Sequence, residues 1–162
     1  IAVTMMTAGT LHPILSCAAA RQLETRLLAT EAAEWDAMQQ AGAAIAVALS
    51  EDAREIGGLG EEPRLLVLAG KGHNGGDALL AAARLLEARA RGGVDVVFPF
   101  GVVALRPLAR RAWENLQHAL PGRVRVLDLA QLKHEFISYD ACLDGGFGFQ
   151  FRPPLDDSVA EL

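Results

Sequence analysis

The sequence has little of what marks several large classes of protein. Its 162 residues include two cysteines, Cys17 and Cys142, too few for a disulfide framework or a four-cysteine zinc site. Both lie in apolar surroundings, and we predict that they are buried free thiols. No apolar stretch is long enough for a membrane-spanning helix. Fifteen basic residues face twenty acidic ones, and the formal charge of −5 disfavours a globally basic nucleic-acid-binding protein.

What the sequence does contain is enough apolar material for one packed domain. Hydrophobic residues make up 51% and charged residues 22%, a balance that excludes wholesale disorder. A chain of this length can bury about 70% of its unfolded surface. Its first residues lack the basic flank and apolar run of a secretory signal, and together with free thiols this predicts a cytoplasmic location.

Helical periodicity fills the first third of the sequence, and strands alternate with helices after it. We expect helices from Ser16, as N-cap, to Ala29 and from Glu31 to Ile56. Gly42 costs the second helix about 1 kcal/mol relative to alanine, which indicates the close approach of another backbone. The remaining pattern predicts strands at 64–69, 94–98, 123–127 and 139–143, and helices at 77–91, 105–120 and 129–136. This alternation predicts an α/β fold, a three-layer αβα sandwich with a Rossmann-like parallel sheet and two added N-terminal helices.

A glycine-rich turn, Gly-Lys-Gly-His-Asn-Gly-Gly-Asp, follows the first predicted strand at 70–77. Its glycines let a backbone approach a ligand, and the next helix directs N–H groups toward it. The dinucleotide fingerprint is matched, but the second strand ends at 98–101 in Phe-Pro-Phe-Gly, without the acid that binds a ribose hydroxyl. The phosphate-loop pattern fails because no Lys-Ser or Lys-Thr follows the glycines. A tight turn without a ligand remains an alternative.

Asn74 and Asp77 favour a ligand site in this turn. An amide and a carboxylate bracket two glycines where a plain turn needs neither. Together they predict an oxygen-rich pocket for ribose hydroxyls or a hard cation. The alternative assigns Asn74 to the turn and Asp77 to the helix dipole.

The second unusual stretch runs from the last predicted strand into glycines interleaved with aromatic residues. Asp144 stands at the carboxyl end of that strand, where this architecture places its sites, although a turn carboxylate is the alternative. Phe147, Phe149 and Phe151 have the period of two that either packs on the body or lines a ligand. Arg152 is either a solvated charge or a partner for a phosphate.

These motifs resemble those of the NAD(P)HX epimerase family, the YjeF N-terminal domain. Residues 67–77 are similar to the family signature, whose usual form is Asn-Asn-Gly-Gly-Asp, and residues 140–151 resemble its second motif. The Gly-Phe-Gln-Phe within that motif is similar to the apolipoprotein A-I-binding protein branch. Residues 35–42 resemble the Met-Glu-x-Ala-Gly helix of the family. The resemblance spans about residues 14–157.

The resemblance implies an isomerase that interconverts the R and S epimers of hydrated NADH and NADPH, NADHX and NADPHX. It implies no redox change, a functional link to an NAD(P)HX dehydratase, and a potassium ion beside the substrate. By the same resemblance Asn74 and Asp144 would hold the potassium ion. The substrate-binding residues would be His73, Asn74, Gly75, Gly76, Asp77, Gly148, Phe149, Gln150, Phe151, Arg152, Pro153 and Pro154. No nucleic acid or membrane partner is expected, and the alanine-rich N-terminal helices could pack on the sheet or on a twin subunit in a homodimer.

The sequence departs from the family pattern at three places. His73 stands where the family has its first Asn, and Gly145-Gly146 replaces Ala-Leu. The third motif, Ile-Asp-x-Pro-Ser-Gly, does not occur, so the expected catalytic Asp lies beyond Leu162 and residues 1–162 are expected to form a single domain without its C-terminal part. The alternative function is a non-catalytic nucleotide-binding or scaffold module of the same fold. A kinase-like fragment is disfavoured by the absent phosphate loop.

Overall fold

A parallel sheet lies at the centre of the computed structural model, which describes residues 15–134 and 137–148. Within these residues the sheet has four strands in the order β3-β2-β1-β4. They are β1 (Arg64–Ala69), β2 (Gly93–Val97), β3 (Val124–Leu127) and β4 (Ala141–Gly145). Every pairing is parallel, and Val67 of β1 is in register with Val96 on one side and Leu143 on the other.

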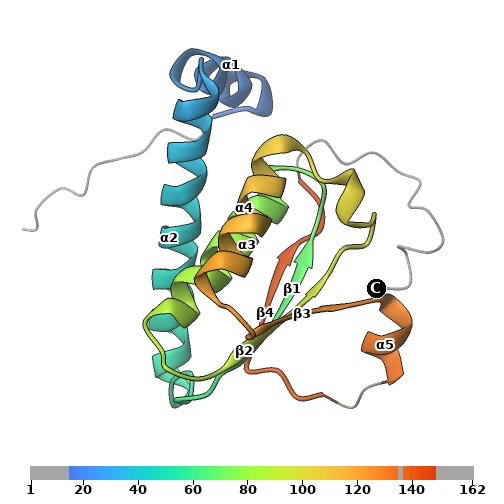
Figure 1. The fold of residues 1–162 in the computed structure, drawn as a ribbon. Coiled ribbons are helices and arrows are strands. Elements are labelled where there is room, and N and C mark those ends of the chain that lie inside the picture. Colours follow the sequence, from blue (N-terminus) through green and yellow to red (C-terminus); the bar gives the residue numbers. More distant parts are fainter. Residues whose placement is uncertain (1–14, 135–136, 149–162) are drawn as a thin grey trace, which may run out of the picture.

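Helices cover both faces of this sheet (Figure 1). They are α1 (Cys17–Leu27), α2 (Glu31–Glu55), α3 (His73–Glu87), α4 (Pro107–Ala119) and α5 (Leu129–His134), with a 3-10 turn η1 (Val102–Ala104) before α4. The main core lies between the sheet and α2, α3 and α4, where Val67, Leu79 and Leu116 are fully buried. On the other face Leu129 and Leu132 of α5 pack on a smaller cluster of strand residues. The predicted three-layer αβα architecture with two added N-terminal helices is confirmed.

The N-terminal helices differ in how they are packed. Ser16 caps α1 as predicted, accepting a hydrogen bond from the Ala19 N–H, but α1 buries none of its residues. The long α2 crosses α3 at Gly42, where a Cβ would lie 2.7 Å from the Leu80 Cβ. The predicted close approach at Gly42 is therefore confirmed. No helix within the described part of the chain is long and apolar enough to cross a bilayer.

The start of α3 differs from the sequence-based prediction. The helix begins at His73, with Gly72 as N-cap, rather than at Asp77. The glycine tract is therefore both the turn and the first helical turn. Glycine is required there because a Cβ on Gly75 would overlap the Gly70 carbonyl oxygen. Asp77 accordingly lies in the second turn of the helix and not at its exposed start.

The prediction that both cysteines are buried is wrong, because Cys17 and Cys142 are exposed. Cys17 opens α1, which buries nothing. Cys142 lies on β4, which pairs only with β1 among the described residues. Side chains alternate along a strand, so Leu143 points into the main core and Cys142 to the face that α5 leaves uncovered there.

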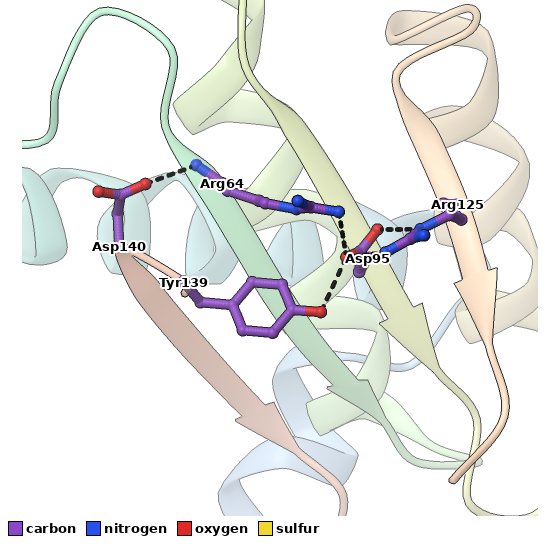
Figure 2. Close-up of polar contacts among 5 residues, drawn as sticks. All are labelled: Arg64, Asp95, Arg125, Tyr139 and Asp140. Carbon is purple, nitrogen blue, oxygen red and sulfur yellow. Dashed lines mark hydrogen bonds and ion pairs between the residues drawn. The ribbon is translucent and has the colours of Figure 1, made fainter. Parts of the chain in front are cut away.

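A cluster of polar side chains at Asp95 joins all four strands (Figure 2). Arg125 of β3 donates two hydrogen bonds of 2.9 Å to the Asp95 carboxylate, and the Tyr139 hydroxyl donates one of 2.8 Å. Arg64 of β1 approaches the same carboxylate to 3.3 Å. Asp140, next to Tyr139 at the entry to β4, accepts a 2.7 Å bond from the Arg64 backbone N–H. The side chain of Asp95 is only 5% exposed, so these donors replace its water.

The hydrogen-bond donors around Asp95 determine the direction in which its pKa is shifted. Burial alone would raise the pKa of Asp95, but the bonds from Arg125 and Tyr139 and the charges of the two arginines outweigh burial and hold this pKa below its usual value. Burial and the bond to Asp95 raise the pKa of Tyr139 to about 12. Because the pKa of Asp95 is lower in the folded state, its ionised form stabilises the fold above the unfolded pKa of about 4. That stabilisation is lost as the pH falls through the folded pKa.

We expect Asp95→Ala to lower the free energy of unfolding at pH 7 by about 2 kcal/mol. Removing one partner of a fully buried ion pair costs about 3–5 kcal/mol. The cost is smaller here because water reaches both guanidinium groups, whose side chains are 45% and 43% exposed. Urea unfolding followed by circular dichroism measures the difference, which should shrink as the pH is lowered through the folded pKa of Asp95.

The matched control is Glu87→Ala, which removes a carboxylate from the exposed Arg84–Glu87 pair on α3. Exposed pairs contribute about 0–1 kcal/mol, so this variant should unfold almost as the parent does. Equal stability of the Asp95 and Glu87 variants at pH 7 would contradict the role assigned to the cluster.

Candidate functional site

The strand order places the candidate site at the carboxyl ends of β1 and β4. From β1 the chain proceeds outward to β2 and β3, whereas β4 pairs with the opposite side of β1. In open parallel sheets, ligands bind at the carboxyl ends of the strands where the order reverses in this way. The segments that follow β1 and β4 are the two glycine-rich stretches of the sequence.

These two segments pack backbone against backbone. The Gly70 N–H donates a 3.1 Å hydrogen bond to the Gly145 carbonyl oxygen. A Cβ on Gly70 would overlap the carbonyl oxygens of Gly145 and Gly146, and one on Gly145 would overlap the Asn74 carbonyl oxygen. Close packing of the two backbones is therefore enough to explain why several of these positions are glycine. The argument for a ligand depends on the side chains around them.

Asn74 ties the segments together through its side chain. Its Nδ2 donates a 2.7 Å hydrogen bond to the Phe147 carbonyl oxygen. A Cβ on Gly148 would lie 3.3 Å from both the Nδ2 and the Oδ1 of this amide. A side chain at position 148 would therefore crowd the amide. With Nδ2 used as a donor to the chain, Oδ1 is the acceptor of this amide.

Asp144 brings a carboxylate to the same place. It is the penultimate residue of β4, in register with Leu68 of β1. One carboxylate oxygen accepts a 2.9 Å hydrogen bond from the Gly146 N–H, which closes the turn after the strand. Asn74 and Asp144 are thus both bonded to residues 146–147. Within the described residues neither belongs to a group of three or more His, Cys, Asp or Glu that could hold a metal ion.

His73 and Asp77 stand one helical turn apart at the start of α3. Asp77 is partly buried, and burial raises its pKa to about 6, although the nearby charge of His73 acts in the opposite direction. His73 is exposed. Between them Gly76 packs on α2, where a Cβ would lie 2.6 Å from the Met38 sulfur. A carboxyl group whose pKa is raised toward neutral pH, near the start of a helix that follows a strand, is typical of binding and acid–base sites.

Lys71 and Phe100 were not among the sequence-predicted site residues. The Lys71 Nζ lies 4.2 Å from the centroid of the Phe100 ring, at the end of β2. The Phe100 ring in turn meets Phe147 edge to face, with centroids 5.8 Å apart. Loops that follow three different strands therefore converge at this edge of the sheet. The sequence does show that Phe100 follows a predicted strand. Periodicity alone cannot show that it contacts Lys71.

The structure brings most of the predicted site residues into the two adjoining segments. The residues found there are His73, Asn74, Gly75, Gly76, Asp77, Asp144 and Gly148. The remaining predicted substrate-binding residues lie outside the described residues; they are Phe149, Gln150, Phe151, Arg152, Pro153 and Pro154.

Comparisons with known proteins identify the family of the chain. The family model described as YjeF-related protein N-terminus matches residues 35–162. The bifunctional NAD(P)H-hydrate repair enzyme Nnr of Gloeobacter violaceus is 35% identical over 150 residues, which cover 92% of this chain and 27% of that protein. The NAD(P)H-hydrate epimerase of Bordetella bronchiseptica is 54% identical over 92 residues, 57% of this chain and 36% of that protein.

The chain thus matches about a quarter to a third of the length of these curated relatives. Among solved structures, the crystal structure of yeast ynu0, YNL200c, aligns with a TM-score of 0.66 at 22% identity, covering 93% of this chain and 63% of that one. That likeness supports the fold. Since the family model matches well over half of the residues, the chain belongs to the family of YjeF-related protein N-termini, as its motifs predicted.

Proposed function

We propose that this chain is part of the epimerase domain of an NAD(P)H-hydrate epimerase, an isomerase that interconverts the R and S epimers of NADHX and NADPHX. Family membership and the names of its relatives support the proposal. The observation that carries it is the junction between the ends of β1 and β4, where Asn74 is bonded to the segment that follows Asp144. This junction lies at the carboxyl ends of the strands, where folds of this kind bind nucleotides.

Each residue at the junction has a distinct task in the proposed reaction. The N–H groups that open α3 suit the phosphates of the dinucleotide. Asp77, which is partly buried, would accept hydrogen bonds from ribose hydroxyls. The family resemblance assigns Gly148 to the substrate site. The reaction removes and restores the C6 hydroxyl, or opens the ring, and needs a proton carrier within hydrogen-bond reach of that hydroxyl. The family resemblance assigns this role to an Asp of the third motif, which does not occur in residues 1–162.

Asn74 and Asp144 fit a potassium ion in the chemistry of their donors. Amide and carboxylate oxygens are the ligands that hard cations take. The bond from Asn74 Nδ2 to Phe147 leaves the Oδ1 of the amide as its acceptor, and the Gly146 N–H fixes one oxygen of Asp144. A bound potassium ion would supply positive charge beside the substrate. The chain's own contribution is to hold these two side chains on neighbouring segments.

The alternative, a nucleotide-binding or scaffold module without catalysis, is favoured by one residue. His73 replaces the first Asn of the family signature, and its side chain is exposed at the start of α3. The partners proposed are the NADHX or NADPHX substrate and a dehydratase that consumes one epimer. A homodimer through the N-terminal helices and a cytoplasmic location remain predictions from the sequence.

Asp77→Asn tests the role of the half-buried carboxyl group. The folded pKa of about 6 exceeds the ordinary value of 3.8, so ionisation of Asp77 costs folding stability as the pH rises between these values. The variant should therefore unfold at higher urea than the parent at pH 7.5 and equally at pH 3.5. Calorimetric titration should show that it binds ADP-ribose more weakly. Unchanged affinity would remove Asp77 from the proposed binding site.

Potassium binding predicts a specific ion effect on stability. At equal ionic strength potassium should raise the melting temperature more than lithium does, because a ligand at a hundredfold excess over its Kd adds about 2.7 kcal/mol. Asp144→Asn should remove most of this difference, and Asp36→Asn, an exposed substitution on α2, should keep it. Identical melting curves in the two salts would eliminate the metal assignment.

The activity itself is tested on the full-length protein that contains these residues. It should convert a single purified NADHX epimer to the epimeric mixture, followed by chromatography. Asn74→Ala removes the bond to Phe147 and should slow conversion by about tenfold or more, since residues that position ligands typically have effects of this size. Asn115→Ala, on the exposed side of α4, is the matched control. Binding of ADP-ribose without conversion would favour the non-catalytic module.

A further inference from the structure

The end of β2 carries no acid where a site for an unphosphorylated ribose would need one. In dinucleotide-binding sheets, an acid near this strand end binds the 2′-hydroxyl of the ribose, whereas an arginine accommodates a 2′-phosphate. Residues 98–101 here are Phe-Pro-Phe-Gly. The question is therefore which charged groups the fold brings to this strand end.

Two cations lie there. The Lys71 Nζ stands 4.2 Å from the centroid of the Phe100 ring, so an aromatic side chain at the end of β2 holds its position. The Arg106 backbone N–H donates a 2.9 Å bond to the Lys71 carbonyl oxygen, which fixes the start of α4 beside the glycine-rich turn. A Cβ on Gly72 would lie 3.8 Å from the Arg106 Nη1, so this guanidinium flanks the N-cap of α3.

Neither cation is neutralised within the described residues. The ion pairs formed there use other arginines; these are Arg64, Arg84, Arg91 and Arg125. The side chains of Lys71 and Arg106 are both exposed; Lys71 lies over the Phe100 ring, and the Arg106 guanidinium lies beside Gly72. Two exposed cations on the segments that flank the glycine-rich turn suit an anion of high charge, such as a phosphate monoester.

We infer that Lys71 and Arg106 select the 2′-phosphorylated form of the dinucleotide, so that NADPHX rather than NADHX is the preferred substrate. This inference rests on the proposed function and names its substrate class. Lys71 supplies a point charge positioned by Phe100, and Arg106 supplies a planar guanidinium that can donate two hydrogen bonds to one phosphate. The absence of a carboxylate at the end of β2 removes the repulsion that such a phosphate would meet.

Calorimetric titration with two ligands tests the inference. The protein should bind 2′-phospho-ADP-ribose at least tenfold more tightly than ADP-ribose in about 0.1 M salt, and the ratio should fall as salt rises. Lys71→Met keeps the apolar stem over Phe100 and should lower the ratio severalfold. The double variant with Arg106→Gln should bring the ratio close to one. Lys133→Met, on α5 against the opposite face of the sheet, is the matched control and should keep the parental ratio.

Charge reversal gives the sharper result. Lys71→Glu places a carboxylate where dinucleotide folds that recognise the 2′-hydroxyl have one, so the preference should invert toward ADP-ribose. Equal binding of the two ligands by the parent protein, or a preference that survives in the double variant, would overturn the inference and leave the proposed function standing. Failure of the parent to bind either ligand would overturn both.

Discussion

The contact between Gly70 and Gly145 is the constraint on which the site depends. Only two residues without side chains allow the turn after β1 to bond directly to the end of β4. That bond sets the distance between the start of α3 and the loop after β4, and Asn74 then joins them by its amide. A methyl group at either glycine would separate the segments that carry Asn74 and Asp144. The geometry of the site therefore depends on two positions that carry no side chain.

Both faces of the sheet contribute to stability, and the loops at its carboxyl edge form the candidate binding site. The face toward α2, α3 and α4 holds the main apolar core, and the opposite face holds Asp95 with its donors. The Asp95 cluster lies among residues of the strands and their entries, away from the loops that follow the carboxyl ends. Changes to the loops can therefore alter ligand selection while the arginines still hold the strands in place.

Periodicity in the sequence was sufficient to predict most of the elements, because β1, β2, α3 and α4 have regular patterns of buried apolar residues. It placed the start of α3 too late, since a tract with four glycines has the composition of a turn and only packing against Gly70 shows that it is helical. It could not predict the Asp95 cluster, whose members are separated by about 30 to 44 residues. The contact between Lys71 and Phe100 could not be predicted either, because these residues are far apart in the sequence and come together only in the folded chain.

The Asp95 cluster has a consequence for how the sheet chooses its pairing. Side chains alternate between the faces of a strand, so a shift of β2 by one residue would carry Asp95 to the side of α3 and α4. There the carboxylate would meet apolar side chains such as Leu79 and Leu116 and lose Arg125 and Tyr139. Burying an unpaired carboxylate costs several kcal/mol, which disfavours the shifted pairing. One acidic residue in an otherwise valine-rich strand thus helps to specify the register in which β2 pairs with its neighbours.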